Sequence, residues 1–467
     1  MRILIDGTAK EKLNPFFFET LSLLFCPSDN KFGEETGKAS GNYINITAED
    51  SYAKIMICNC GKIDVGSVEI SPSEDYSVET AKLFYRIAQN LTGIAPPWGI
   101  YTGIRPARAA DTADADALCK LYLMSADKAA LAVKTNKFGR DALIRAGEHN
   151  PRDFSLYISV PFCPTRCHYC SFISYATPRF LKLIPDYLPK LTEELKYLGE
   201  TVRERGMKLR TIYIGGGTPT TLTESQLDIL CKAAADNFDI ANGIEYTVEC
   251  GRADTITREK LVTLKRHSVN RISINPQTLC DATLERIGRN HTAEQFYQAF
   301  ALAREIGFDV INSDVIAGLP GDAPGETVST VRKLAESLSP ENITVHTFCV
   351  KKSARAKDDG DSYSAYSSDT EREVSECHAI LESAGYIPYY MYRQKYTSSN
   401  LENTGYAKPA TECMYNIYMM DEVHSIIAAG AGAVTKIVCG GKIERSANYK
   451  YPYEYIGNGY KCIDGLL

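Results

Sequence analysis

The sequence predicts an α/β protein built around a parallel sheet with helical crossovers. Two observations support this prediction. From residue 154 onward, short β-branched runs alternate with amphipathic helical stretches, giving about six βα units in a row, which is typical of a parallel sheet. Polar residues gather where the predicted strands end, at Gly215 to Thr218, Glu249, Gln277 and Asp314. In barrel-like α/β folds, this edge of the sheet carries the chemistry.

Residues 1–150 are predicted to form a small mixed α/β domain. MRILID (1–6) and YAKIMICNC (52–60) have the composition of strands, and SVETAKLFYRIAQNLTG (77–93) has the apolar spacing of a helix that stops at a glycine. Turn-forming residues and an alanine-rich helical stretch follow. GEHNPRD (147–153) is the expected joint to the next domain.

Residues 151–360 are predicted to form the central α/β domain. Its strands are short β-branched runs, and its helices carry apolar residues at helical spacing. Thr223 is the expected cap of one helix. The predicted strands are 155–160, 211–217, 245–250, 271–277, 309–321 and 342–348, and the predicted helices include 185–206, 223–238 and 292–307.

Residues 361–467 are predicted to form a separate α+β domain that caps the centre. The polar stretch SARAKDDGDSYSAYSSD (353–369) has the composition of a mobile connection. One helix and three strands are predicted after it, at 371–385, 387–396, 433–438 and 442–448.

The overall composition is that of an ordinary globular protein. The chain has 467 residues, of which 44% are hydrophobic, and a formal net charge of −6. A nucleic-acid partner would call for a basic face, which this charge does not indicate. Charged residues interrupt the N-terminal segment, so no signal peptide is predicted, and no stretch reaches the ~20 apolar residues of a membrane span. A cytoplasmic location is therefore expected.

Three of the 15 cysteines are clustered in SVPFCPTRCHYCSF (159–172). Cys163, Cys167 and Cys170 have the spacing C-x3-C-x2-C. In a reducing compartment, clustered cysteines more often bind metal or act in catalysis than form disulfides. A structural zinc site usually takes four ligands, and no second cysteine pair lies nearby in the sequence. An iron–sulfur cluster held by only three cysteines leaves one iron open, which is a mark of catalysis.

With Tyr169 directly before its third cysteine, this segment resembles the signature of the radical S-adenosylmethionine (SAM) superfamily. Other segments occur in the order found in its oxygen-independent coproporphyrinogen III oxidase (coproporphyrinogen dehydrogenase) branch, and TGIRPAR (102–108) resembles the HemZ-type subgroup. The similarity is dense over residues 155–350 and implies a partial (β/α)6-type TIM barrel as the core. The segments are LYISVPFCPTRCHYCSF, IGGGTPT, TVEC, RISINPQT, RIGRNHT and DVIAGLPG.

The resemblance implies cofactor roles for residues of this chain. Cys163, Cys167 and Cys170 would hold a [4Fe–4S] cluster, and the amine and carboxylate of SAM would occupy its fourth iron. Glu249 would accept hydrogen bonds from the ribose hydroxyls, and the glycines of GGGTP would let the backbone approach the methionyl end. Some positions match a second SAM site, so one or two SAM molecules are expected. The expected SAM contacts are Tyr157, Tyr169, Gly216, Gly217, Thr218, Glu249, Gln277, Arg289, Asp314, Cys349 and Val434.

The resemblance also implies a reaction. A reduced cluster would give one electron to SAM, and the resulting 5′-deoxyadenosyl radical would remove a hydrogen atom from a propionate of coproporphyrinogen III. Loss of CO2 and a second electron leaves a vinyl group, and two rounds give protoporphyrinogen IX. A reductase or a flavodoxin- or ferredoxin-type protein would supply the electrons.

The implied tetrapyrrole substrate carries four carboxylates, so a local basic lining is expected. The candidates are Arg105 and Arg108, together with Lys351 and Lys352 beyond the last barrel strand. Ordinary surface placement is the alternative for each of them.

Three alternatives to this reaction stay open. Related heme chaperones share the core motifs and deliver heme without turnover. In the best-understood dehydrogenases, a further cysteine stands two residues after the third one, where this chain has Phe172. Another radical SAM reaction, such as methyl transfer, would use the same cofactors. A zinc-stabilised interaction protein would contain zinc and no iron.

Overall fold

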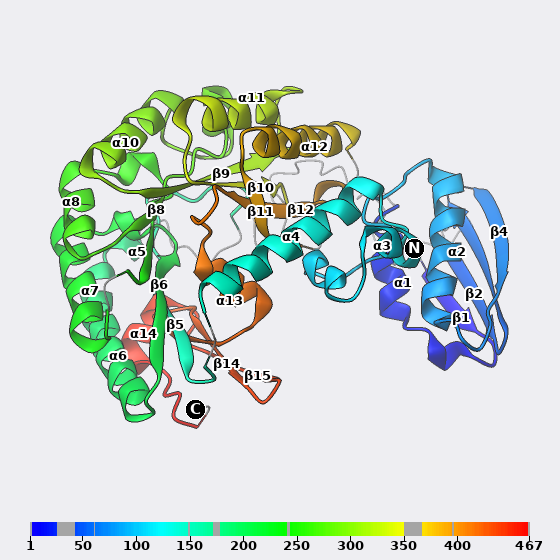
Figure 1. The fold of residues 1–467 in the computed structure, drawn as a ribbon, viewed down its shortest axis with the longest axis horizontal. Coiled ribbons are helices and arrows are strands. Elements are labelled where there is room, and N and C mark those ends of the chain that lie inside the picture. Colours follow the sequence, from blue (N-terminus) through cyan, green and yellow to red (C-terminus); the bar gives the residue numbers. More distant parts are fainter. Residues whose placement is uncertain are drawn as a thin grey trace.

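Two sheets organise the part of the chain that the structure describes, one with four strands and one with eleven (Figure 1). The structure is a computed structural model that describes residues 2–25, 43–59, 61–147, 150–170, 178–240, 243–349, 367–394 and 397–465. Phe172, Lys351 and Lys352 lie outside these residues. No helix within these ranges is long and apolar enough to cross a membrane.

The smaller sheet lies near the N-terminus and has the strand order β1-β2-β3-β4, with a parallel first pair and antiparallel pairs after it. Alternate residues of β2, namely Ile44, Ile46 and Ala48, point into its core. Helix α2 begins after the cap Asp75 and ends at Gly93, whose φ is +71°, which confirms the predicted helix. The elements are β1 (Arg2–Asp6), α1 (Pro15–Ser22), β2 (Tyr43–Glu49), β3 (Tyr52–Asn59), β4 (Lys62–Glu69) and α2 (Tyr76–Thr92).

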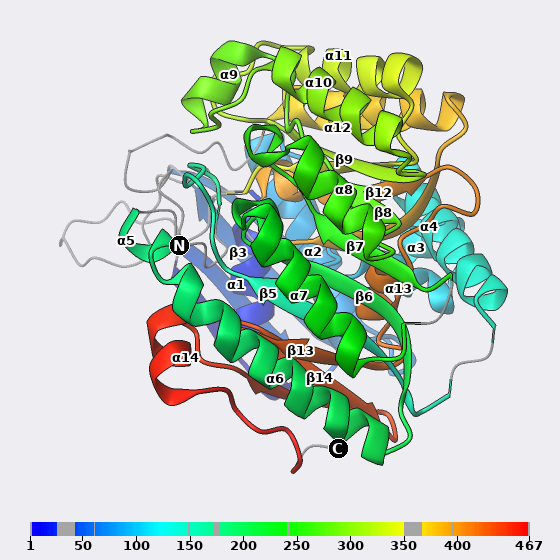
Figure 2. The same ribbon diagram turned by 90° about the vertical axis from the view of Figure 1, so that its left-hand side faces the viewer.

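Six parallel strands, paired in chain order from β5 to β10, form the centre of the larger sheet. Helices cover its outer face, and Figure 2 shows α6, α7, α8 and α10 side by side. This arrangement confirms the predicted α/β barrel-like core. The strands are β5 (Asp153–Val160), β6 (Lys208–Gly216), β7 (Glu245–Glu249), β8 (Arg271–Ser273), β9 (Val310–Ala317) and β10 (Asn342–Thr347). The helices are α5 (Pro178–Leu181), α6 (Ile184–Glu204), α7 (Glu224–Asn237), α8 (Arg258–Arg266), α9 (Asp281–Arg286), α10 (Ala293–Ile306) and α11 (Glu326–Lys333).

The C-terminal strands do not form the predicted separate domain at 361–467. They extend the same sheet, which has the order β11-β12-β10-β9-β8-β7-β6-β5-β13-β14-β15. β12 pairs antiparallel with β10, and β13 pairs parallel with β5, so both free edges of the parallel core are paired by later segments. The elements are α12 (Ser368–Ser383), β11 (Ile387–Arg393), β12 (Glu402–Ala407), α13 (Met414–Asp421), β13 (Ser425–Ala429), β14 (Val434–Cys439), β15 (Lys442–Ala447) and α14 (Pro452–Asn458).

The predicted N-terminal domain at 1–150 also divides differently. Helix α3 (Ala115–Tyr122) precedes α4 (Ala126–Arg145), which packs along β11 of the large sheet (Figure 1). Trp98 and Met391 share one hydrophobic cluster with these helices. Helix α4 therefore belongs to the large body, because its apolar face is buried against β11, whereas Ile100 and Tyr122 pack in the core of the small sheet.

Helix α13 lies against the inner face of the large sheet. Tyr415 at its start stacks on Tyr213 of β6, with ring centroids 4.5 Å apart. The carboxylate of Glu245 accepts the backbone N–H groups of Met414 and Tyr415, which caps the helix. Since Glu245 begins β7, α13 occupies the amino end of the strands and leaves the carboxyl end for the site.

Candidate functional site

A cavity of about 430 Å³ lies at the carboxyl ends of the parallel strands. β5 to β10 contribute through their last residues or the loops after them, and β11 and β12 complete the wall. Among the residues predicted to bind the cluster or SAM, the lining includes Tyr157, Cys163, Cys167, Tyr169, Cys170, Gly216, Gly217, Thr218, Glu249, Gln277, Arg289, Asp314 and Cys349. The structure thus brings together side chains that are up to 192 positions apart, from Tyr157 to Cys349.

The three cysteines lie on the loop that follows β5. The backbone N–H of Cys170 donates to the carbonyl of Cys167, and the hydroxyl of Thr218 lies 3.4 Å from Sγ of Cys163. Among the described residues, no three His, Cys, Asp or Glu side chains are arranged around one metal ion. An iron–sulfur cluster does not need its cysteines around one metal ion, because each cysteine binds a different iron.

Glycines let the loop after β6 approach the cysteine loop closely. Gly216 has a φ of +104°, which favours glycine. A Cβ on Gly217 would lie 2.5 Å from the carbonyl oxygen of Phe162. The N–H groups of Gly217 and Thr218 donate to the carbonyls of Val160 and Phe162. The close backbone approach that the glycines allow here is between the two loops, which it joins; their approach to the methionyl end of SAM stays a prediction.

Glu249 ends β7 inside the cavity, where the hydroxyl of Tyr213 donates a hydrogen bond to its carboxylate. Burial, and then the nearby charge of Asp314, raise the pKa of Glu249 to about 7. A carboxylate in such surroundings gains from hydroxyl donors, because hydrogen bonds to the ionised form stabilise it. The ribose of SAM would supply such donors.

Gln277 is held in an uncommon conformation in the cavity wall. Its φ is +66°, and its backbone N–H donates to the carbonyl of Asp314. Its buried side-chain oxygen has no hydrogen-bond partner among the described residues. Strained backbone and an unpaired acceptor gather at ligand sites, so Gln277 fits a contact to a bound donor.

Asp314, His346 and Tyr392 form a polar group in the lining of the cavity. Nε2 of His346 lies 3.6 Å from Oδ2 of Asp314, and the Tyr392 hydroxyl lies 3.5 Å from Nδ1 of His346. Burial acts to raise the pKa of Asp314, but the hydrogen bond and charge of His346 leave it below its ordinary value.

Several cavity residues were not predicted from the sequence. Thr165 lies inside the cysteine motif, Asn403 follows no predicted strand, and the others lie in or just after a predicted strand. They include Thr165, Tyr213, Arg252, Asn275, His346, Tyr392, Gln394 and Asn403.

Three other predicted residues lie outside the cavity. The guanidinium of Arg105 forms a two-pronged ion pair with Glu422, and Arg108 contacts the same carboxylate. Because Glu422 precedes β13, which is parallel to β5, both arginines lie near the amino edge of the sheet. Their predicted place in the substrate lining is therefore corrected. Val434 begins β14, is 43% exposed and does not line the cavity.

Comparison with known proteins assigns this architecture to a class. A family model described as the radical SAM superfamily matches residues 157–334. The solved structure of coproporphyrinogen III oxidase (HemN) from Escherichia coli, a radical SAM enzyme, shares the fold with a TM-score of 0.55. That similarity covers 70% of this chain and 74% of that one at 24% identity.

Similar sequences narrow the class. The oxygen-independent coproporphyrinogen-III oxidase-like protein HemZ of Bacillus subtilis is 38% identical over 388 residues, which cover 80% of this chain and 77% of that protein. The heme chaperone HemW of Bacillus subtilis is 38% identical over 204 residues, which cover 42% of this chain and 51% of that protein. This chain belongs to the radical SAM superfamily and, within it, to the family of oxygen-independent coproporphyrinogen III oxidase-like proteins.

The residues present fit the cofactors of this family, a [4Fe–4S] cluster and SAM. Cys163, Cys167 and Cys170 would hold the cluster, and the glycine loop, Glu249 and Gln277 offer acceptors and open backbone to SAM. When bound, these groups supply one-electron chemistry and a carbon-centred radical. The residues that would hold and orient the cluster and SAM line one cavity. The three cysteines are therefore assigned to an iron–sulfur cluster, which replaces the alternative of a zinc-stabilised interaction protein.

Proposed function

We propose that this protein is an enzyme that decarboxylates coproporphyrinogen III without oxygen, converting two propionates to vinyl groups and giving protoporphyrinogen IX. The similarity to HemZ of Bacillus subtilis, an oxygen-independent coproporphyrinogen-III oxidase-like protein, supports this assignment, since that match takes in 80% of the chain. The matches to heme chaperones cover less of the chain, 42% for HemW of Bacillus subtilis and 66% for HemW of Escherichia coli, the latter at 27% identity.

The observation that carries the proposal is that one cavity holds the residues for the cofactors together with further polar side chains. The cysteines, the glycine loop and Glu249 line this cavity, and so do His346, Tyr392, Gln394 and Asn403. A substrate bound by these further side chains would lie in the same cavity as the cofactors. Such placement brings a reacting C–H group to the radical without diffusion of either partner.

The proposed reaction also involves a second SAM site, contacts to the substrate carboxylates and an electron donor. Gln277, Arg289, Asp314 and Cys349 would contact a second SAM molecule or the region next to it. Lys351 and Lys352 follow Cys349 in the chain and would meet the carboxylates of the substrate. A reductase or a flavodoxin- or ferredoxin-type protein would reduce the cluster.

The test is an anaerobic assay of the full chain. The protein is reconstituted with iron and sulfide, reduced, and given SAM and coproporphyrinogen III. The proposal predicts 5′-deoxyadenosine and CO2 in step, and a tetrapyrrole lighter by two units of CO2 and two of H2. Glu249→Gln is the matched variant. It leaves the cysteine loop unchanged and is expected to form the product more slowly. Formation of 5′-deoxyadenosine with no change in tetrapyrrole mass would refute the decarboxylation.

The second candidate is a heme chaperone, favoured by the 38% identity to HemW over 204 residues. It predicts that the same preparation binds heme tightly, shown by a new absorption band, and passes it to an apo-hemoprotein. Coproporphyrinogen III would then remain unchanged. The assay above and a heme titration together separate the two functions.

A further inference from the structure

Arg252 is a buried arginine that none of the roles above uses. It lies in the loop after β7, is 3% exposed, and lines the cavity next to the cysteines. A buried guanidinium cannot lose its charge and therefore needs a partner for each donor. Its partners show which part of the site it serves.

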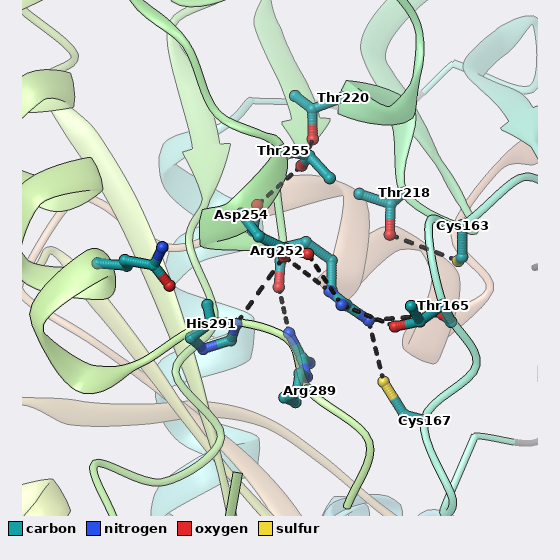
Figure 3. A network of polar contacts seen from close by, with 12 residues as sticks. Cys163, Thr165, Cys167, Thr218, Thr220, Arg252, Asp254, Thr255, Arg289 and His291 are labelled. Carbon is teal, nitrogen blue, oxygen red and sulfur yellow. Dashed lines mark hydrogen bonds and ion pairs between the residues drawn. The ribbon is translucent and has the colours of Figure 1, made fainter. Parts of the chain in front are cut away.

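All five N–H donors of Arg252 have an acceptor (Figure 3). Nε and Nη2 donate to the two carboxylate oxygens of Asp254, at 3.0 and 3.1 Å. Nη2 also donates to the hydroxyl of Thr165 at 2.8 Å, and Nη1 donates to the Thr165 carbonyl at 3.5 Å. The fifth donor, on Nη1, points to Sγ of Cys167 at 3.5 Å. Asp254 thus orients the guanidinium of Arg252, and the remaining donors of the guanidinium bind the cysteine loop.

Hydrogen bonds also fix the backbone of Arg252. Its carbonyl accepts the N–H and the hydroxyl of Thr255, and that hydroxyl lies 2.6 Å from the hydroxyl of Thr220. The ammonium group of Lys260 donates to the carbonyls of Thr220 and Thr255. This network ties the loops after β6 and β7 to α8, so the guanidinium is held by the sheet itself.

A second buried arginine serves as a comparison. Nη2 of Arg289 donates to the hydroxyl of Tyr169 at 2.8 Å, and Nη1 donates to the carbonyl of Gly251 at 2.7 Å. Arg289 therefore holds the cysteine loop through Tyr169, whereas Arg252 reaches a cysteine sulfur directly.

We propose that Arg252 is a positioning residue for the cluster, which orients Cys167 through Thr165 and raises the reduction potential through its charge and its N–H···S bond. The physical reason is electrostatic. Reduction adds one negative charge to the cluster, and a fixed cation and a donor at the sulfur stabilise that charge. Burial strengthens the effect, because water screens it less. The proposal depends on the family cofactor and not on the identity of the substrate.

The test compares reconstituted Arg252→Met and Arg252→Lys with the unchanged protein. The midpoint potential of the cluster is measured by redox titration followed by electron paramagnetic resonance, and the Fe–S(Cys) stretching frequencies by resonance Raman. Arg252→Met is expected to shift the potential to more negative values and to raise one stretching frequency, because the sulfur loses a donor. Arg252→Lys keeps the charge, and its midpoint potential is expected to lie between those of Arg252→Met and the unchanged protein.

Arg258→Gln is the matched control. It removes the same charge six positions further along, from a half-exposed side chain that pairs with Glu305, and should leave the potential unchanged. If the Arg252 variants carry the cluster at the potential of the unchanged protein, the proposal is wrong. If neither variant retains iron, Asp254→Asn decides, since it keeps the guanidinium and removes its counter-charge. A more positive potential in that variant supports the proposal, and an unchanged one refutes it.

Discussion

Glu249 shows at the scale of one residue how the fold prepares a ligand contact. Tyr213 from the neighbouring strand donates to its carboxylate, and Tyr415 of α13 stacks on the Tyr213 ring. Burial and then the charge of Asp314 raise the pKa of Glu249 to about 7. The group therefore ionises near neutral pH, and a ligand that donates hydrogen bonds to it favours the ionised form.

Replacing Glu249 with glutamine is expected to weaken SAM binding by roughly 10- to 150-fold, since hydrogen bonds to a charged acceptor contribute about 1.5–3 kcal/mol. Affinity in the unchanged protein should rise between pH 6 and pH 8, roughly one unit either side of its pKa of about 7, as the carboxylate ionises. The amine of SAM adds a pH dependence of its own, common to both proteins. Equilibrium dialysis across this range provides the comparison, with Glu305→Gln as an exposed control. Equal pH profiles for the unchanged protein and Glu249→Gln would contradict the assigned role.

Residues inside compact motifs could be predicted from the sequence, and isolated ones could not. The cysteine loop and the glycine loop each place several functional groups within a few positions, so their spacing carries information. Arg252 and His346 are single polar residues near strand ends, and only the sheet brings them to the cavity. Arg105 has the charge expected of a substrate contact, but Glu422, 317 positions away, pairs with it.

Among the elements, helix α6 is fastened to the C-terminal part of the chain by one buried carboxylate. Glu194 accepts hydrogen bonds from the Gly430 N–H, the Asn448 amide and the Tyr455 hydroxyl. Burial raises its pKa to about 7, although these three donors act to lower it. The loop after β13 and helix α14 are therefore held against the outer helices by a group that titrates near neutrality.

Glu194→Gln is expected to reduce the free energy of unfolding by about 1–3 kcal/mol, because one acceptor becomes a donor among three donors. The folded state holds the proton of Glu194 at a pH where the unfolded chain has lost it. The stability this adds is complete below the ordinary value of 4.5 and is lost as the pH rises through about 7. The variant should therefore show a flatter pH dependence between 5 and 8.

Denaturant titrations at several pH values measure this effect. Glu193→Gln, on the same helix but 55% exposed and paired only with Lys190 among the described ion pairs, should change stability by less than about 0.5 kcal/mol. A pH slope in Glu194→Gln as steep as in the unchanged protein would contradict the account.

Helices and strands with strong local signals were predicted from the sequence, but the pairing of the strands was not. Helix α2 has a cap and a terminal glycine in the sequence, and α7 has the predicted cap Thr223. The strands β11, β12 and β13 were placed in a separate domain, or missed, because pairing with β10 and β5 joins residues far apart in the chain. Sequence periodicity indicates which face of a strand is buried, but does not identify its neighbour.

For the whole molecule, a buried ion pair joins the segment after α2 to the large sheet. Lys128 of α4 donates to Glu402 of β12, and the indole N–H of Trp98 donates to the other carboxylate oxygen at 2.7 Å. Burial acts to raise the pKa of Glu402, but the charge of Lys128 holds it at about 2. Asn403, the next residue, lines the cavity. The attachment of this segment and the shape of the cavity therefore depend on the same strand.

Lys128→Met is expected to cost roughly 3–5 kcal/mol of unfolding free energy, because Glu402 remains buried without its cation. Lys134→Met, on the same helix with a half-exposed pair to Glu382, should cost less than about 1 kcal/mol. Chemical denaturation gives both values, and hydrogen exchange should show faster exchange in α4 for the first variant alone. Similar losses for the two variants would show that the buried pair does not fasten the segment.

The central claim is that Cys163, Cys167 and Cys170 hold one cluster with an iron left open to SAM. The most direct measurement is the iron and sulfide content and the electron paramagnetic resonance spectrum of the reduced, anaerobically reconstituted protein, with and without SAM. The claim predicts one [4Fe–4S] cluster per chain, a spectrum that changes when SAM is added, and loss of both in Cys167→Ala. Full iron content and an unchanged response to SAM in Cys167→Ala would contradict it.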